Sequence, residues 1–260
     1  MKPEPLFASV TQFASATRCI LLCLDFDGTL APIRDRPEEC ELDPAVARTL
    51  TALAACNRIK LAIVSGRELN DLRGRVGIAG ITYAGNHGLE IEGPGFAFRE
   101  PTAVNLSGVL DKLTLKLALA VASIPGVRVQ SKGLSASVHY RQSRADAAPR
   151  IIEIVRQVSA SAIAAHQVVL RKGKKVVEVR PSVNWDKGKA VRWIANRAAT
   201  SNPPLLIYCG DDDTDEDAFI ECRDGITVLV GENPHSAAQY FVRTPADVHA
   251  FLELLLAAFC

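Results

Sequence analysis

The sequence predicts a mixed α/β fold, a doubly wound parallel sheet into which a smaller α+β domain is inserted. Short, almost wholly apolar runs occur near both ends of the chain, as expected for strands buried on both faces of a parallel sheet. Amphipathic helical patterns alternate with these runs. The middle of the chain instead carries strands with one polar face. We therefore place the core in residues 1–104 and 184–260 and the inserted domain in residues 105–183.

Composition excludes several classes of protein. The chain has 260 residues and a formal net charge of +1, so it lacks the basic balance of a nucleic-acid-binding protein. The N-terminal region shows no long apolar run, and we expect neither a signal peptide nor a membrane anchor. The seven cysteines are scattered without a CxxC pair, which favours neither a disulfide framework nor a zinc site. We therefore expect a cytoplasmic protein with reduced cysteines.

The core elements are predicted from apolar patterns and from turn residues. The pairs Asp43-Pro44 and Thr244-Pro245 are helix-start signals, because a capping side chain precedes a proline at the first helical position. Helices are therefore predicted after each pair and over Trp185–Ala199. The predicted strands are Ile20–Leu24, Ile59–Val64, Ile81–Ala84, Leu205–Cys209 and Ile226–Val230, with a hairpin over Leu89–Phe98. Met1–Thr17 is expected to form a leader helix or a loose arm.

The inserted domain is predicted to have the order helix, two strands, helix, two strands. Its strands alternate apolar and polar residues, which is typical of a sheet with one face in water. The predicted helices are Leu106–Ser123 and Ala147–Ala160, and the predicted strands are Val127–Gln130, Ala136–Tyr140, Val168–Leu170 and Lys175–Val179. An antiparallel sheet of this kind indicates a separate unit.

Polar clusters follow the apolar strands of the predicted core at four places. They are Asp25 with Asp27, Ser65 with Arg67, Asn86 with His87, and the acidic run Asp211–Asp215. Ligands of doubly wound sheets bind at the carboxyl ends of the strands. One such cluster is explained by a turn, whereas four on separate strands indicate a common site. Carboxylates as close as Asp25 and Asp27 repel each other, and a divalent cation between them would relieve that repulsion.

The segment DFDGTL from Asp25 resembles the first motif of the haloacid-dehalogenase-type phosphotransferases, which have a Rossmann-like core. In that superfamily the first aspartate is the nucleophile and the second is the general acid/base, with Mg²⁺ beside them. The resemblance therefore implies these roles for Asp25 and Asp27. Ser65 can hydrogen-bond a phosphate oxygen, and Lys187 can supply a fixed positive charge.

Mg²⁺ is the predicted cofactor, because it prefers a few hard carboxylate oxygens and keeps several waters. Its predicted ligands are Asp25, Asp27, Asp211 and Asp212. We also expect Asp212 and Asp215 to orient ligands and water around the ion.

Taken singly, these residues also have structural explanations. Ser65-Gly66-Arg67 is a common helix cap and turn, and Lys187 alone would be a solvated helix residue. The acidic run could be a helix start favoured by the helix dipole. Their order along the chain, each after a buried strand or at a helix start, favours the functional interpretation.

Further motifs resemble the trehalose-6-phosphate phosphatases, and the resemblance extends from Leu21 to Phe219. They are GDDDTDEDAF from Gly210, SGR from Ser65, GNHGLE from Gly85, VHYR from Val138, VVEVRP from Val176 and WDKG around Lys187. Two departures concern substrate fit more than chemistry. Asn86 stands where a small residue or serine is expected, and the basic stretch RKGKK from Arg171 is long.

In this family the inserted domain is a cap that closes over the sugar. The resemblance implies that Arg141, Lys174 and Glu178 of the cap bind the substrate. The predicted substrate-binding residues in the core are Arg67, Asn86 and His87. Cations suit the phosphate, and a carboxylate suits sugar hydroxyls. Glu178 has an alternative as a cross-strand partner of a nearby lysine, and His87 has one as a residue that orders its loop.

The resemblance implies a magnesium-dependent phosphatase that hydrolyses trehalose 6-phosphate through an aspartyl-phosphate intermediate. One alternative is another sugar-phosphate phosphatase or phosphomutase of the same fold. A second is a catalytically silent domain that regulates a partner. We expect a monomer that binds neither nucleic acid nor membrane, with functional pairing to a trehalose-6-phosphate synthase as a further expectation.

Overall fold

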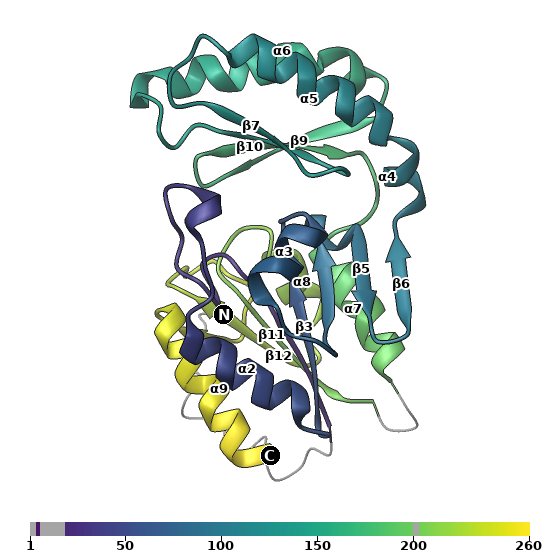
Figure 1. Ribbon diagram of the computed structural model, residues 1–260, viewed down its shortest axis with the longest axis vertical. Coiled ribbons are helices and arrows are strands. Elements are labelled where there is room, and N and C mark those ends of the chain that lie inside the picture. Colours follow the sequence, from purple (N-terminus) through teal and green to yellow (C-terminus); the bar gives the residue numbers. More distant parts are fainter. Residues whose placement is uncertain (1–3, 6–18, 200–202) are drawn as a thin grey trace. The chain divides into compact units, whose positions relative to one another are not determined.

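The computed structural model describes residues 4–5, 19–199 and 203–260, and the chain divides into two compact units (Figure 1). The core unit comprises Met1–Phe98 with Trp185–Cys260, and the inserted unit comprises Arg99–Asn184. Most of the predicted leader Met1–Thr17 lies outside the described residues.

The core unit is built on one sheet. Among the described residues its strands lie in the order β1-β13-β12-β11-β2-β3-β4-β5-β6. They are β1 (Glu4–Pro5), β2 (Ile20–Leu24), β3 (Ile59–Val64), β4 (Thr82–Gly85), β5 (Glu90–Gly93), β6 (Phe96–Arg99), β11 (Leu205–Gly210), β12 (Ile226–Val230) and β13 (Tyr240–Val242). In this spatial order, every pair of adjacent strands between β1 and β4 is parallel, and β5 runs antiparallel to β4. The prediction of a doubly wound parallel sheet is confirmed.

Helices cover both faces of this sheet. One face packs against α2 (Pro44–Ala55), α3 (Leu69–Val76) and α9 (Pro245–Phe259), and the other against α7 (Lys187–Ala198) and α8 (Glu216–Glu221). Alternate residues of β2 serve the two faces, with Leu22 in the first core and Leu21 in the second. The predicted caps are present: Asp43 accepts from the backbone N–H of Ala45, and Thr244 and Asp247 form a capping box.

β2 lies where the sheet changes direction. The chain runs outward from β2 through β3 and β4, and later outward from β11 through β12 and β13 on the other side. At such a switch point the loops after the two central strands diverge and leave a crevice at their carboxyl ends. The backbone N–H of Asp25 donates to the carbonyl oxygen of Cys209 at 2.9 Å, which ties the end of β2 to β11. The topology therefore brings the motifs at Asp25 and Asp211 together.

The inserted unit is an antiparallel sheet with two long helices on one face (Figure 1). Its strands lie in the order β7-β8-β10-β9. They are β7 (Arg128–Ser131), β8 (Ala136–His139), β9 (Val168–Gly173) and β10 (Val176–Pro181), and the helices are α4 (Pro101–Asn105), α5 (Ser107–Val121) and α6 (Ala148–Ala164). Leu117, Val138 and Val155 are among the apolar side chains buried between the helices and the sheet. The predicted α+β character is confirmed.

One disulfide corrects the prediction made from the cysteines. Cys56 follows α2 and Cys260 follows α9, and their sulfur atoms are bonded across a separation of 204 residues. The expectation of reduced cysteines was wrong for this pair, because α2 and α9 pack side by side and bring distant residues together (Figure 1). The cytoplasmic location rested on reduced cysteines and stays a prediction.

The sequence prediction lacks several short elements, among them α3, α8 and β13. Each of these three is held by a neighbour in the fold: β13 pairs with β12, α8 packs on α7, and α3 packs beside β4. Among the described residues, no helix combines the length and the apolar character needed to cross a membrane.

Candidate active site

Asp25 and Lys187 form a buried ion pair at the carboxyl end of β2. The Nζ of Lys187 lies 2.8 Å from Oδ1 of Asp25, and the two side chains are 3% and 5% exposed. Burial raises the pKa of Asp25 well above its usual range, the charge of Lys187 opposes this rise, and the carboxylates of Asp215 and Asp211 add to it. A further cation beside Asp25 would therefore favour its ionised form.

Lys187 is also bound by Asp215, at 2.7 Å from Nζ to Oδ1. It is the first residue of α7, and the side chain of the N-cap residue Asp186 accepts from the backbone N–H of Lys189 at 2.8 Å. Burial alone would lower the pKa of Lys187, but the charges of Asp215 and Asp25 raise it well above its usual value. Lys187 is therefore a permanent positive charge in a dry position.

Asp215 is fully buried and accepts four hydrogen bonds. Its Oδ1 accepts from Lys187 and from the hydroxyl of Tyr208 at 2.5 Å, and its Oδ2 accepts from the backbone N–H groups of Asp211 and Asp212. Asp215 thus holds both the lysine and the acidic loop in place. Sequence reasoning missed Tyr208. Its signal is a single tyrosine in an otherwise apolar buried strand, where a hydroxyl needs a partner.

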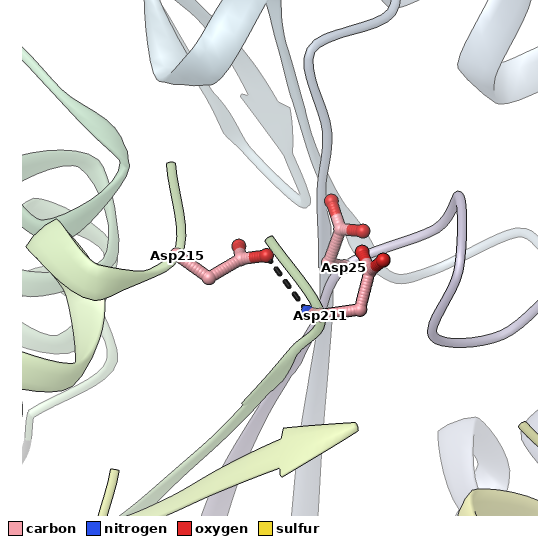
Figure 2. A group of neighbouring side chains, drawn as sticks. All are labelled: Asp25, Asp211 and Asp215. Carbon is pink, nitrogen blue, oxygen red and sulfur yellow. Dashed lines mark hydrogen bonds between the residues drawn. The ribbon is translucent and has the colours of Figure 1, made fainter. Parts of the chain in front are cut away.

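Three carboxylates of the described residues form a group able to hold a cation. One oxygen from each of Asp25, Asp211 and Asp215 lies within 4.8 Å of the others, and Figure 2 shows the carboxylates of Asp25 and Asp211 close together. Gly28 makes room for this approach, because a Cβ there would lie 2.2 Å from Oδ2 of Asp211. The donors are hard oxygens, which suit Mg²⁺.

Asp27 and Asp212, also predicted as metal ligands, lie outside that group of described carboxylates. Oδ1 of Asp212 accepts from the backbone N–H and the hydroxyl of Thr214, at 2.8 and 2.6 Å. Burial raises the pKa of Asp212, but the charge of Lys187 and the bonds from Thr214 outweigh it and lower the pKa to about 2. Asp212 is therefore ionised at neutral pH and shapes the acidic loop.

Asp27 is held by Arg67. The Nε and Nη2 of Arg67 each lie 2.6 Å from one oxygen of Asp27, which is a two-pronged ion pair. Arg67 was predicted to bind substrate, and the structure places its guanidinium on Asp27 and Asp71. Ser65 is buried, and its Oγ accepts from the backbone N–H of Arg67 at 3.2 Å. This bond agrees with the structural alternative for Ser65-Gly66-Arg67, a helix cap and turn. The hydroxyl hydrogen of Ser65 can still be donated.

Asn86 and His87 form a buried turn after β4. Both adopt positive φ angles, 50° and 57°, in the left-handed region that non-glycine residues seldom occupy. The side chain of Asn86 donates to Glu90 at 2.9 Å. The ring of His87 packs against Gly66, where a Cβ would lie 2.5 Å from the ring carbon Cε1. The turn therefore packs tightly against the loop that carries Ser65.

The predicted residues of the inserted unit have partners within that unit. Arg141 donates to the carbonyl oxygen of Lys174 at 2.8 Å, near the turn between β9 and β10. Glu178 on β10 accepts from Lys132 at 2.9 Å and from Arg180 at 2.8 Å. The contact with Lys132 agrees with the cross-strand alternative for Glu178, and sequence reasoning missed both cations.

Comparisons with known proteins identify the family of the chain. A family model described as "Trehalose-phosphatase" matches residues 23–246. The chain is 40% identical over 244 residues to an uncharacterized glycosyl hydrolase of Mycobacterium tuberculosis, with 89% of this chain and 18% of that protein covered. It is 36% identical over 239 residues to a trehalose-phosphate phosphatase of Mycobacterium tuberculosis, with 89% of this chain and 60% of that protein covered.

A solved structure extends the comparison to the fold. The crystal structure of a trehalose-6-phosphate phosphatase related protein superposes with a TM-score of 0.79 at 26% identity, covering 91% of this chain and 97% of that one. The chain thus spans less than two thirds of the two curated relatives but almost the whole of this solved structure. The family model covers the acidic motifs after β2 and β11 and the inserted unit between them. On this match, the chain belongs to the trehalose-phosphatase family.

Proposed function

We propose that the chain hydrolyses trehalose 6-phosphate to trehalose and inorganic phosphate through an aspartyl-phosphate intermediate on Asp25. The observation that carries the proposal is the buried ammonium of Lys187 bound between Asp25 and Asp215, in a chain of the trehalose-phosphatase family. A fixed positive charge beside a carboxylate suits a phosphate monoester, because it offsets charge on the phosphate oxygens without reorganising water.

In the first step an oxygen of Asp25 attacks the phosphorus atom, and the bond between phosphorus and the sugar oxygen breaks. Asp27 donates a proton to the departing oxygen, which leaves as a hydroxyl of trehalose. Lys187 and the hydroxyl of Ser65 bind the phosphate oxygens during the transfer. Both are nearly fully buried, so neither has to exchange a water shell at that moment.

In the second step water attacks the phosphorus atom of the aspartyl-phosphate. Asp27, ionised after the first step, takes a proton from that water. The bond between phosphorus and Asp25 then breaks, which releases inorganic phosphate and restores the carboxylate. The side chain of Asp27 is 38% exposed, so water can reach it.

Mg²⁺ fits the donor set, and Asp25 and Asp211 are the residues we propose to hold it. Asp215 already accepts four hydrogen bonds, so we assign it the support of its neighbours. Ligand roles for Asp27 and Asp212 stay predictions. When bound, the ion would supply positive charge that favours the ionised form of Asp25 and offsets the charge of the phosphate.

A panel of phosphate esters tests this proposal. Phosphate release would be measured with Mg²⁺ for trehalose 6-phosphate, glucose 6-phosphate, sucrose 6-phosphate and mannose 6-phosphate. We expect the highest kcat/KM for trehalose 6-phosphate, no turnover in excess chelator, and recovery when Mg²⁺ is restored. Preference for another sugar would favour a related phosphatase. An inactive chain that still binds a sugar phosphate would favour a silent regulatory domain.

The cap contacts, partners and location are proposals that rest on the resemblance. We propose that Arg141, Lys174 and Glu178 contribute to sugar recognition, as the cap does in the family. We also propose a cytoplasmic monomer that works beside a trehalose-6-phosphate synthase. Size-exclusion chromatography with light scattering tests the monomer, and co-purification with the synthase tests the pairing.

A further inference from the structure

A chain of four alternating charges leads from Asp27 away from the candidate site. Arg67 holds both oxygens of Asp27, and its Nη1 lies 2.8 Å from Oδ2 of Asp71. Oδ1 of Asp71 in turn lies 2.9 Å from the Nε of Arg75. Asp71 and Arg75 lie on α3, four residues apart, so one helical face presents both. Neither residue has a place in the proposed chemistry.

The two arginines also hold the loop that follows the DFDGTL motif. Arg67 donates to the carbonyl oxygen of Pro37 at 2.8 Å. Arg75 donates to the carbonyl oxygens of Cys40 at 2.7 Å and Glu38 at 3.1 Å. Asp27, the loop over residues 37–40 and α3 are thus joined by charged hydrogen bonds, which are stronger than neutral ones.

Arg67 has little freedom in this arrangement. Its side chain is 8% exposed, and its guanidinium carbon lies 5.3 Å from the centre of the Phe26 ring. Three anchors, Asp71, Pro37 and Phe26, therefore fix the plane of the guanidinium before it meets Asp27. A carboxylate has about four acceptor positions, and the two bonds from Arg67 occupy two of them. The direction of the remaining positions, where a proton would sit, is then fixed as well.

We propose that Asp71 and Arg75 are positioning residues that act through Arg67 to aim the proton of Asp27 at the departing sugar oxygen. This inference rests on the proposed function. A sugar alkoxide is a poor leaving group, so its departure depends on a proton delivered along the right direction. A p-nitrophenolate leaves without a proton. Misdirecting Asp27 should therefore slow transfer from a sugar phosphate and spare transfer from an aryl phosphate.

The experiment compares two substrates in matched variants. Asp71→Asn keeps the shape of the side chain and weakens its bonds to both arginines, and Arg75→Lys keeps the charge but loses the paired donors. Arg73→Gln is the control, since Arg73 lies on the same helix and pairs at the surface with Glu92. For each, kcat/KM would be measured with trehalose 6-phosphate and with p-nitrophenyl phosphate, alongside a thermal melt.

We expect Asp71→Asn to lower kcat/KM for trehalose 6-phosphate by about 10- to 100-fold, which is part of the rate enhancement that general acid catalysis supplies. The same substitution should change kcat/KM for p-nitrophenyl phosphate by less than about threefold. Arg75→Lys should also lower kcat/KM selectively for trehalose 6-phosphate, but by a smaller factor. Arg73→Gln should match wild type on both substrates. In an Asp27→Asn background, Asp71→Asn should have no further effect on the sugar ester, because the group it aims is gone.

Equal losses on both substrates, or an undiminished effect of Asp71→Asn in the Asp27→Asn background, would overturn the inference and leave a structural role. If Asp71→Asn unfolds at the assay temperature, Arg75→Lys alone tests the inference. The measure is again the loss of kcat/KM on trehalose 6-phosphate relative to the loss on p-nitrophenyl phosphate. Failure of the proposed function looks different. Wild type would then prefer another sugar phosphate, and the selectivity would be tested on that ester instead.

Discussion

At the scale of single residues, Asp25 is the proposed nucleophile, and its position has a cost to stability. It is buried beside two other carboxylates, and one lysine is shared between it and Asp215. We expect Asp25→Asn to reduce turnover of trehalose 6-phosphate by more than a hundredfold, because an amide cannot form the aspartyl-phosphate. The melting temperature should not fall, since the amide can still accept from Lys187 and removes a buried negative charge.

Phosphate release and a thermal melt of the same preparation check this prediction. A retained rate above about a hundredth of wild type would exclude a covalent nucleophile at this position, because its loss costs several kcal/mol.

Tyr208 gives a second prediction at this scale. Tyr208→Phe removes the hydroxyl that donates to Asp215 and leaves the buried ring in place. We expect a loss of about 1–3 kcal/mol of stability together with a lower kcat, because Asp215 holds Lys187 and the acidic loop. Tyr83→Phe is the matched control. Its hydroxyl bonds to the backbone of Ile78, so stability should fall while kcat stays at the wild-type value.

Denaturant melts and initial rates for both variants provide the measurement. A kcat of Tyr208→Phe equal to that of Tyr83→Phe would show that the hydroxyl serves stability alone.

Sequence patterns predict some residues of the candidate site and miss others for a physical reason. Asp25 and Asp211 are visible because each directly follows an apolar strand, and the switch point brings such positions together. Asp71 carries no local signal, since an acid on a helix is ordinary. The tyrosine in the apolar run of β11 indicates that its hydroxyl needs a partner but not which residue supplies it. The partner of Arg67 was not predictable either, because Asp27 lies 40 residues away in sequence.

At the scale of elements, β10 gives a prediction about the inserted unit. Glu178 lies between Lys132 and Arg180, and its backbone is paired with Ser137 across the sheet. If it also binds the sugar, Glu178→Ala should lower kcat/KM for trehalose 6-phosphate by about 10- to 1,000-fold, as expected for charged hydrogen bonds. Hydrolysis of p-nitrophenyl phosphate should barely change, since it offers no sugar hydroxyl.

Steady-state rates on the two substrates decide between the roles of Glu178. Lys132→Met is the informative companion, because it breaks the same ion pair and keeps the carboxylate. Equal losses on both substrates in Glu178→Ala, matched by those in Lys132→Met, would assign Glu178 to the sheet alone.

Elements that have a clear sequence pattern were predicted well. Elements that depend on packing against other parts of the fold were not. β2, β3 and β12 have the predicted bounds, because each is an apolar run closed by turn residues. α3 has only eight residues and includes Gly74, so its sequence has little helix preference of its own. Its packing beside β4 supplies the stabilisation that its own helix preference does not.

At the scale of the whole molecule, the disulfide joins the ends of α2 and α9. We expect reduction of Cys56–Cys260 to lower the melting temperature by about 5–15 °C, because the bond closes a loop of about two hundred residues in the unfolded chain. Thermal melts with and without a thiol reductant measure the effect. Cys56→Ser should melt at the lower temperature in both conditions, and a wild-type protein insensitive to reductant would contradict the prediction.

The order of the strands along the chain has a consequence for synthesis. Asp25 leaves the ribosome 162 residues before Lys187, an interval of about 8–30 s at usual rates of translation. Throughout that time β2 lacks β11, so it presents an open edge of apolar residues, which is a template for pairing with other chains. The inserted unit has its own core and can fold within this interval. Until β11 is made, the open edge of β2 is therefore the place where we expect pairing with other chains during synthesis.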